Sequence, residues 1–531
     1  MTGMVSAQEG RQPGAIWVFL IPLLCFALSV WFSWDSRLDL DVAYFAGTAK
    51  AVSEGLHLYE QVIDANPPGP VLVGIVSYAI SNHVGAEFDQ VLTVLYLVLD
   101  LVLCGLVLAI FAPVLRRGSV EQGLVLALGV STLFFLSDPL IGKRDLVGAL
   151  LLVPWAGAII MRRANQPENK YLAAIAGVFG GLSMMFKPHF ALMATALALL
   201  DLVHARGRIR KLSFSTFGAA VSWFLSYTAL ALMEPAYFKE IIPFAMETFG
   251  RLSQGFADPL AVLQRRWFMV GLPVILLSAI AGSIHGWKNI DKAGLFATAG
   301  TLVILFFAAL LQYSVQGFGL KYQAVPAKVL YLALIFSGLV FLSARYQPAI
   351  FRIGAIAILI VISGALGHSV ADMPSRRDVV DHPLVRRMSP EEPGKSVLMV
   401  SPSVKGMGEV YIFLDAKWAG VSLVHWPLAT LIKQDGRYAR ENHVPEDRRQ
   451  GLADWYRGRI AEIFAEARPQ RVAFDVSGHL RWFEDSNFDI LAWLREDPGF
   501  DQAWRDGAFV PYGDPIAFEG RLFQVYKGYA P

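Results

Sequence analysis

The sequence has little charge for its length. Of its 531 residues only 17% are charged, whereas 55% are hydrophobic and the mean hydropathy is +0.46. A soluble protein needs a charged outer shell that this chain mostly lacks, so an ordinary soluble enzyme is excluded. The net charge is only +2 and there is no basic tail, which argues against nucleic acid as a partner. The apolar residues are therefore expected to face lipid.

Cysteine and the familiar catalytic motifs are also scarce. The two cysteines, Cys25 and Cys104, both lie inside long apolar runs, so the sequence predicts neither a disulfide framework nor a cysteine metal site. There is no H-E-x-x-H motif, P-loop or nucleophile elbow, and hydrolase and ATPase functions therefore have no local support.

What the sequence does contain is a series of apolar stretches long enough to cross a membrane, for which about 20 apolar residues are needed. The first stretch lacks an A-x-A type cleavage site, so it is expected to be a retained span rather than a signal peptide. The predicted spans are 15–34, 90–114, 120–137, 145–161, 171–186, 188–204, 212–232, 267–285, 293–313, 326–344 and 349–369.

Basic residues between these stretches predict the orientation, because short loops rich in Lys and Arg stay in the cytoplasm. All the basic loops share a side with the N-terminus only if the apolar stretch 68–83, which begins at Pro67-Pro68, does not cross. We therefore predict an α-helical polytopic membrane protein with about eleven spans and a helix on the outer face. The basic loops contain Arg116 and Arg117; Arg162, Arg163 and Lys170; Arg206, Arg208, Arg210 and Lys211; Lys288 and Lys292; and Arg345 and Arg352.

The composition changes near residue 371. Residues 371–531 are richer in charge, tryptophan and turn residues and contain no spanning stretch. We predict a membrane domain over 1–370 and a soluble, extracytoplasmic α/β domain over 371–531. The predicted strands of the second domain are 395–400, 420–425, 471–476 and 521–526, and its predicted helix is 451–467.

The first predicted outer loop carries acidic residues next to a span. Asp39 and Asp41 follow the first span directly, where partial loss of water raises the pKa of a carboxylate and makes it a better base. Tyr44 follows them, and Asp64 and Asn66 precede the two prolines. The alternative is that these acids are solvated loop residues.

The second predicted outer loop carries basic residues on the side where they are disfavoured. Asp138, Lys143, Arg144 and Asp145 lie together at the start of a span. Binding of an anionic headgroup would explain the two cations. Pairing of Arg144 with Asp145 or Asp138 explains them equally well.

Two more outer turns carry cations. Lys187 and His189 lie between two apolar spans, where ionisable groups are costly and point to a function. A Lys187 that only extends to the interface is the alternative. Lys321 and Tyr322 follow a glycine-containing turn and are candidate contacts for a sugar phosphate. Acids on one loop and cations on the others suit a reaction in which a base activates a hydroxyl while cations stabilise a leaving phosphate.

The outer-loop motifs resemble those of the GT-C superfamily of polytopic membrane glycosyltransferases, in the bacterial branch similar to protein mannosyltransferases and lipid A aminoarabinose transferases. Residues 41–44, DVAY, resemble the family's D-E-A-Y; residues 64–68, DANPP, resemble D-N-K-P-P; and residues 143–146, KRDL, look like an R-E-H-L variant. The resemblance covers roughly residues 15–370.

The resemblance implies an inverting transfer of a sugar from a polyprenyl-phosphate donor to an envelope glycan, lipid or protein acceptor, on the outer face of the bacterial inner membrane. Asp41 matches the family's general base for the acceptor. Asp64 is expected to shape the acceptor or sugar site, and Asp138 lies where the family carries a second-loop acid. The residues expected to hold the donor phosphate are Lys143, Arg144 and Lys187.

Two positions depart from the family pattern. The glutamate after the catalytic aspartate is Val42, which removes a paired carboxylate, so no cofactor is assigned and a divalent metal is not favoured. Asp39 could take part of that glutamate's role. The lysine before the two prolines is Asn66, so its charge would have to come from another residue. The candidates are Lys143, Arg144, Lys187 and Lys321.

Two other classes of function compete. A glycolipid transporter or flippase would account for the many spans, but it predicts charged or broken helices near the middle of the bilayer, and apart from Asp100 the spans contain few such residues. A scaffold for other envelope enzymes would need only an anchor, for which eleven spans are excessive.

Overall fold

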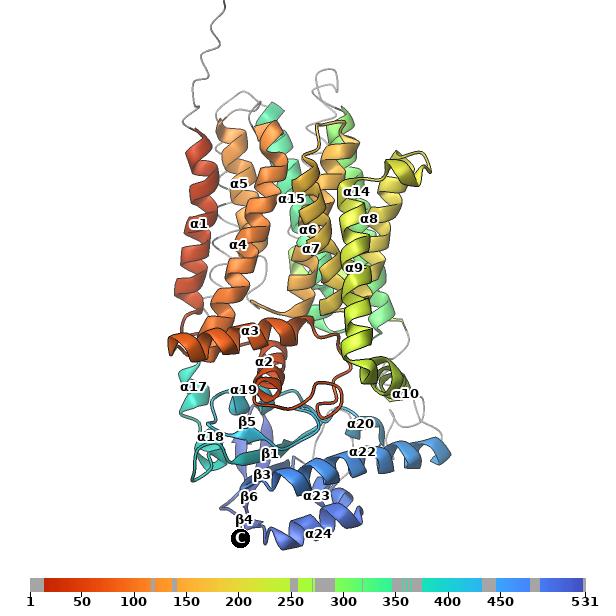
Figure 1. Ribbon diagram of the computed structural model, residues 1–531. Coiled ribbons are helices and arrows are strands. Elements are labelled where there is room, and N and C mark those ends of the chain that lie inside the picture. The colour runs from red at the N-terminus through yellow and green to blue at the C-terminus, as the bar shows by residue number, and fades with distance from the viewer. Residues whose placement is uncertain are drawn as a thin grey trace, which may run out of the picture.

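The computed structural model has two parts. Figure 1 shows a bundle of long helices and, at one end, a smaller part built around a sheet. We call the end of the bundle that meets the sheet the near end and the opposite end the far end. The described residues are 14–115, 120–135, 141–248, 256–269, 271–272, 292–317, 319–345, 357, 360, 364, 375–431, 446–477 and 488–528.

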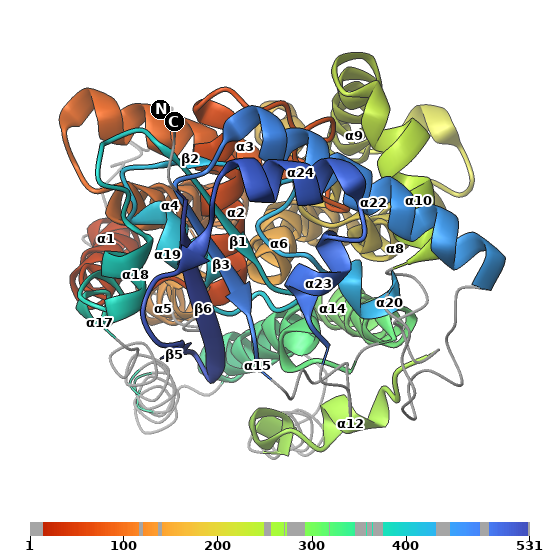
Figure 2. The same ribbon diagram turned by 90° about the horizontal axis from the view of Figure 1, so that it is seen from below.

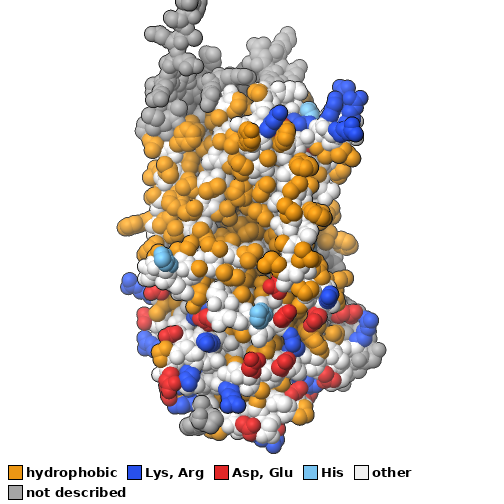
Figure 3. All heavy atoms as spheres, in the orientation of Figure 1, with side chains coloured by type: hydrophobic (Ala, Val, Ile, Leu, Met, Phe, Trp, Pro, Cys, Tyr) orange, Lys and Arg blue, Asp and Glu red, His pale blue; other side chains and the backbone are white. Residues whose placement is uncertain are grey.

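The bundle helices coincide with the apolar stretches of the sequence, because a helix satisfies all its backbone hydrogen bonds internally and can therefore face lipid. Five helices among the described residues are long and apolar enough to cross a membrane, and the rest are shorter. Apolar side chains form a broad belt around the bundle (Figure 3). The helices are α1 (Gly14–Ser33), α4 (Phe88–Leu115), α5 (Val120–Phe135), α6 (Arg144–Arg163), α7 (Lys170–Phe186), η1 (Pro188–Phe190), α8 (Ala191–His204), α9 (Phe214–Met233), α14 (Lys292–Gln316) and α15 (Val325–Arg345).

The predicted spans 267–285 and 349–369 lie mostly outside the described residues. At the far end, Arg162 Nε lies 3.0 Å from Asp201 Oδ1, and Asp201 Oδ2 accepts the backbone N–H of Ser213 at 2.7 Å. These bonds fix the loop that carries Arg206 to Lys211. Figure 3 shows basic side chains gathered there, far from the sheet.

Helices α7 and α9 pack at very close range. A Cβ on Gly177 would lie 1.9 Å from the backbone oxygen of Ser215, and one on Gly218 would lie 2.5 Å from that of Ala174. Small residues let helix backbones approach in this way, which is a common basis of helix association in membranes.

The first predicted outer loop contains two helices at the near end. Helix α3 (Gly69–Val84) begins after Pro68 and ends at Gly85, whose φ is 67°. It lies roughly perpendicular to the bundle helices, at the near end (Figure 1). This is the direction predicted for a helix that does not span the membrane. Helix α2 (Leu40–Ser53) was not predicted, because its apolar residues do not form a long run.

The C-terminal part contains one mixed sheet with strand order β2-β1-β3-β6-β4, and β5 pairs with β6. β1 is parallel to β2 and β3, whereas β6 is antiparallel to β3. Figure 2, seen from below, shows the sheet and its helices in front of the bundle. The strands are β1 (Ser396–Val400), β2 (Lys417–Trp418), β3 (Arg471–Asp475), β4 (Val510–Pro511), β5 (Ile516–Phe518) and β6 (Arg521–Lys527). The helices are α17 (Arg377–Val380), α18 (Pro383–Met388), α19 (Met407–Ile412), α20 (Leu428–Leu431), α22 (Glu446–Ala467), α23 (Ile490–Leu494) and α24 (Pro498–Asp506).

Three predicted strands and the predicted helix of this part are confirmed in β1, β3, β6 and α22. The predicted strand 420–425 is wrong. Val421 and Leu423 are fully buried, but the segment is irregular, and the backbone N–H of Ile63 binds the Val421 oxygen at 2.5 Å. A buried apolar segment has the composition of a strand without joining the ladder.

Between the two parts lie short helices that complete the near end. These are η3 (Tyr237–Ile241) and α10 (Ile242–Glu247) after α9, α12 (Leu260–Leu263), and η5 (Lys321–Ala324) before α15, while η2 (Ile209–Lys211) lies at the far end.

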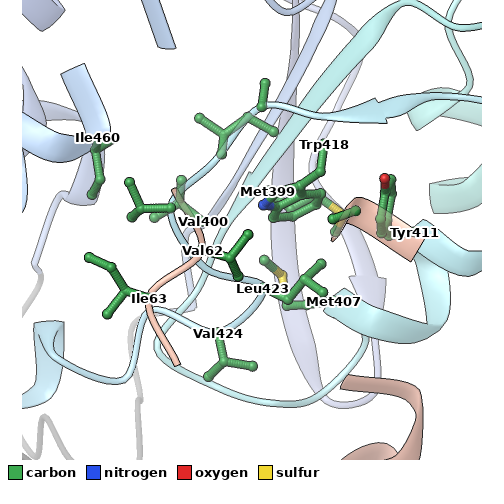
Figure 4. Close-up of a cluster of buried hydrophobic side chains, with 14 of the residues drawn as sticks. Val62, Ile63, Met399, Val400, Met407, Tyr411, Trp418, Leu423, Val424 and Ile460 are labelled. Atoms are coloured by element: carbon green, nitrogen blue, oxygen red, sulfur yellow. The ribbon is translucent and has the colours of Figure 1, made fainter. Parts of the chain in front are cut away.

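One hydrophobic core joins the first loop to the sheet. Figure 4 shows Val62 and Ile63 among Met399, Leu423 and Val424, and all five are buried. The predicted boundary at residue 370 therefore separates segments that share a core.

The packing of α7 on α9 gives a first prediction. Gly177→Ala should destabilise the protein by about 1–3 kcal/mol, because the new methyl group meets backbone and not a movable side chain. Thermal unfolding in detergent would measure this. Gly105→Ala in α4 is the matched control, since a Cβ there meets nothing within 4 Å, and it should leave stability unchanged or slightly raised. Equal melting temperatures for the two variants would contradict the packing argument.

Candidate functional site

The acidic residues of the first loop lie at the start of α2. Asp39 is the N-cap, and its side chain accepts a hydrogen bond from the backbone N–H of Asp41 at 3.0 Å. This satisfies one of the N–H groups that a helix start leaves free. Asp41 lies in the first helical turn, where negative charge is favoured. The local helix thus accounts for two acids at this spacing.

Helix α2 is positioned by the C-terminal part. A Cβ on Gly408 would lie 2.3 Å from the backbone oxygen of Ala43, so α19 and α2 cross with no room for a side chain. The buried Lys50 donates from Nζ to the backbone oxygens of Tyr411, at 3.2 Å, and Leu414. A cation is favoured at a helix C-terminus. These contacts direct the start of α2 toward the bundle.

Two basic residues at the start of α6 pair with the acids of α2. Lys143 Nζ lies 3.1 Å from the carboxylate of Asp39, and Arg144 Nε lies 3.1 Å from Asp41 Oδ2. Arg144 also donates from Nη1 to Oδ1 of Asn66. The four paired side chains are 8% to 19% exposed, so water screens them little. Burial raises the pKa of Asp39, while the Lys143 charge lowers it.

Asp64 is a deeply buried acid of the site, at 1% exposed. One of its oxygens accepts the backbone N–H of Asn66 at 2.8 Å and the Asn66 side-chain amide at 2.6 Å. Burial raises the pKa of Asp64 to about 6, although these hydrogen bonds and the Arg144 charge lower it. Tyr44 is buried beside it, and Tyr59 donates from its hydroxyl to the Asn66 backbone oxygen at 2.7 Å.

A third cation lies in the turn between α7 and α8. Lys187 Nζ lies 2.8 Å from Asp145 Oδ1 and donates to Gln316 Oε1 at 2.5 Å. Burial lowers the pKa of Lys187, against the Asp145 charge, which raises it. Lys187 is buried and does not extend to solvent. The ring of Tyr322 lies 4.8 Å from Lys143 Nζ and 5.6 Å from Lys187 Nζ, so it links the two cations.

Most of the predicted site residues come together in this cluster. Asp145 pairs with Lys187, and Arg144 pairs with Asp41, which was not among its predicted partners. Lys321 is exposed, and no ion pair or hydrogen bond links it to the cluster within the described part of the chain. Asp138 lies outside the described residues. The members are Asp39, Asp41, Tyr44, Asp64, Asn66, Lys143, Arg144, Asp145, Lys187 and Tyr322, with the half-buried His189 two residues from Lys187.

Sequence analysis missed two contributors. Gln316 is a buried amide at the near end of α14, and its signal was a polar residue at the end of an apolar run. Tyr59 is an ordinary loop residue in the sequence, and only the fold brings it to Asn66.

The arrangement is suited to an anion that must be held and released. Three cations are each matched by one carboxylate, at the pairs Lys143–Asp39, Arg144–Asp41 and Lys187–Asp145. A phosphate would exchange with these carboxylates for the same donors, and charge-assisted bonds in a poorly hydrated site are strong. The described residues include no group of three or more His, Cys, Asp or Glu side chains that could hold a metal ion.

The fold is similar to that of two solved structures. One is ArnT from Cupriavidus metallidurans bound to undecaprenyl phosphate, with 11% sequence identity and a TM-score of 0.52 over 96% of this chain and 98% of that chain. The other is the apo state of the same ArnT, with 10% identity and a TM-score of 0.52 over 97% of this chain and 98% of that chain. The chain has a GT-C-like fold. No protein-family model and no curated protein sequence matches it.

This GT-C-like fold, with its apolar helices, makes the chain a membrane protein. Inside the bundle lies a cavity of about 100 Å³, lined almost only by apolar side chains of α4, α5, α6, α14 and α15. On α6 its lining begins at Ala149, five residues or about 7.5 Å along the helix from Arg144, and extends to Ile160. An apolar space therefore lies next to the charged cluster, on the side toward the far end of the bundle.

The raised pKa of Asp64 makes stability depend on pH. Because the folded-state pKa, about 6, lies above the usual value near 4, the folded protein holds the proton more tightly, and stability falls as the pH rises from about 4 to about 6. Asp64→Asn should remove this loss, worth roughly 2–3 kcal/mol. Melting temperatures of wild type and variant should be measured between pH 4 and pH 7. The melting temperature of the variant, relative to that of wild type, should increase as the pH rises. The exposed Asp381→Asn is the control, and a difference independent of pH would refute the assignment.

Proposed function

We propose that the protein is an inverting glycosyltransferase that moves a sugar from a polyprenyl-phosphate donor to an envelope glycan, lipid or protein acceptor, with Asp41 as the general base. The observation that carries the proposal is the ion pair of Asp41 and Arg144. It belongs to a cluster of cations at the near end, next to an apolar cavity inside the bundle. ArnT, which shares the GT-C-like fold, was crystallised with undecaprenyl phosphate.

The donor has one anionic and one apolar part, and the near end of the bundle offers a place for each. Lys143, Arg144 and Lys187 hold the phosphate and stabilise the negative charge that develops as it leaves. The apolar cavity inside the bundle, next to these cations, receives part of the polyprenyl chain. Arg144 and part of the cavity lining both belong to α6, so this helix contributes to holding each part of the donor.

Asp41 is better placed than Asp64 to act as the base. The Asp41 side chain is 19% exposed, so an acceptor hydroxyl can reach it, whereas Asp64 is 1% exposed and its oxygen is engaged by Asn66. The donor phosphate takes Arg144 from Asp41 and so frees the carboxylate. Asp41 then removes the proton of the acceptor hydroxyl, and that oxygen attacks the anomeric carbon from the side opposite the phosphate. The bond from carbon to the phosphate oxygen breaks, and polyprenyl phosphate leaves with the electron pair.

Asp64 and Asn66 support this base. The Asn66 side chain accepts a hydrogen bond from Arg144 and donates one to Asp64. The loop before α3 therefore holds the Arg144 guanidinium in place while the donor phosphate replaces Asp41 as its other partner. Tyr322, between two of the cations, borders the phosphate position.

The reaction is placed on the outer face of the bacterial inner membrane, with the N-terminus in the cytoplasm. The basic loop residues at the far end of the bundle support this orientation, because Lys and Arg are retained on the cytoplasmic side. Residues 1–370 form the membrane domain, and residues 371–531 form an α/β domain outside the membrane.

Removal of the base tests the mechanism. Asp41→Asn should lower the rate of transfer by about 10²–10⁴ when purified full-length protein is given a panel of polyprenyl-phosphate sugars and an envelope acceptor extract, because an amide cannot take the proton. Donor binding should remain, since the cations are intact.

The exposed Asp381→Asn is the matched control and should transfer at the wild-type rate. A wild-type rate for Asp41→Asn would exclude Asp41 as the base. Movement of labelled glycolipid across vesicles, without a new glycosidic bond, would instead favour a transporter.

The orientation has its own test. A phosphatase that is active only outside the cytoplasm should be inactive when fused after Lys211 and active when fused after residue 531. Since all residues of the cluster lie at the end of the bundle that contacts the C-terminal part, the reverse pattern would place the site in the cytoplasm and exclude a periplasmic reaction.

A further inference from the structure

A second polar space lies at the near end, beside the cation cluster. It is an open pocket of about 440 Å³ between the first loop, the end of α9 with η3, and α22 of the C-terminal part. Figures 1 and 2 both show α22 alongside α10, which follows η3. Its polar lining consists of His57, Glu60, Gln61, Lys239, Glu240 and Arg459.

The charged groups of this pocket are not neutralised by one another. Glu60, Lys239 and Glu240 have exposed side chains that take part in no hydrogen bond or ion pair within the described part of the chain. Arg459 reaches across the pocket to the backbone oxygen of Glu60 rather than to its carboxylate. Arg459 also pairs with Glu462 outside the lining, whereas the side chains of Glu60, Lys239 and Glu240 leave donors and acceptors free for a ligand.

The charge balance identifies the class of ligand. Two acids and two bases line the pocket, so it offers no net charge to a phosphate or another anion. A mixture of carboxylates, an amide, an imidazole and cations suits the hydroxyl groups of an uncharged saccharide, which both donate and accept hydrogen bonds. The cation cluster of the bundle is also balanced in charge, but Lys143 and Lys187 are buried there, whereas Lys239 in the pocket is exposed.

The pocket is connected to the cluster through Tyr59. This residue lies between His57 and Glu60, has a φ of 68° and is 1% exposed, with its ring 4.6 Å from that of Tyr237. Such a backbone conformation is strained for a tyrosine and persists only where its surroundings hold it. Its hydroxyl binds the Asn66 backbone, and Asn66 binds Arg144. Tyr59 and Asn66 thus lie between the pocket and Arg144.

We propose that this pocket binds the acceptor, and that the acceptor is a neutral oligosaccharide whose units before the accepting sugar lie between the first loop, η3 and α22. This inference rests on the proposed function. It gives the C-terminal part a role in acceptor selection, because Arg459 belongs to α22 and closes one side of the pocket.

A double variant tests the pocket without touching the cluster. Lys239→Ala with Glu240→Gln changes two exposed side chains outside the core, so folding should be preserved. The full-length protein in nanodiscs is titrated with an array of neutral bacterial oligosaccharides of two to six sugars, and with the matching monosaccharides. Wild type and Asp41→Asn should bind some of the oligosaccharides at least tenfold more tightly than the double variant does. None of the three proteins should bind the monosaccharides as tightly as wild type binds these oligosaccharides.

The matched control changes a similar acid and base elsewhere. Glu392 and Lys395 form an exposed pair on the C-terminal part, and Glu392→Gln with Lys395→Ala should bind like wild type. Equal oligosaccharide binding by the pocket variant and wild type, or no binding of any neutral oligosaccharide by wild type, would overturn the proposal.

Transfer assays separate this proposal from the one on which it rests. The pocket variant should raise the KM for an oligosaccharide acceptor about tenfold and leave the slow release of the donor sugar to water unchanged. Pocket-dependent binding without any sugar transfer would overturn the glycosyltransferase and keep the pocket. Sugar transfer with an unchanged acceptor KM would overturn the pocket and keep the glycosyltransferase.

Discussion

The ion pair between Arg144 and Asp41 is the contact on which the near end of the bundle depends. A guanidinium that is 12% exposed would be costly without a partner, and loss of one member of such a buried pair is worth roughly 3–5 kcal/mol. The neighbouring pair of Lys143 and Asp39 joins positions 104 residues apart. Together these pairs attach α2 to α6, and Asn66 adds the loop before α3.

The same helix α2 is held from the other side by packing rather than by charge. Gly408 lets α19 approach the backbone of Ala43, and Lys50 binds carbonyl groups in the last turn of α19 and just after it. The position of the two acids is therefore set by two attachments of different physical kind, one from the bundle and one from the C-terminal part. The bundle and the C-terminal part are therefore not independent at this site, because both position α2.

The parts of the fold that could be predicted from the sequence are those that depend on local composition. Long apolar runs predict helices, and α4, α6 and α9 lie where such runs were found. The segment 420–425 shows the limit of this approach, because burial alone gives a loop the composition of a strand. Helix α2 was missed because its buried residues are small and mixed with polar ones.

Most members of the site could also be predicted, because charged residues beside apolar spans are conspicuous, but their partners could not. Nearby acids in the sequence suggested that Arg144 pairs with Asp145 or Asp138. In the fold Arg144 instead pairs with Asp41, and Asp145 pairs with Lys187. The choice depends on which helix ends meet, and no local pattern contains that information. Gln316 and Tyr59 join the site for the same reason.

The burial of Lys50 has a consequence for how the protein is made. Its partner Tyr411 lies 361 residues later in the chain, so at about 5–20 residues per second the ribosome needs roughly 20–70 s to supply it. During that interval the first loop has been made, but its apolar surface and this lysine lack their final contacts. The first loop is thus among the early segments to be synthesised, yet it completes its buried contacts only after the chain has passed residue 411.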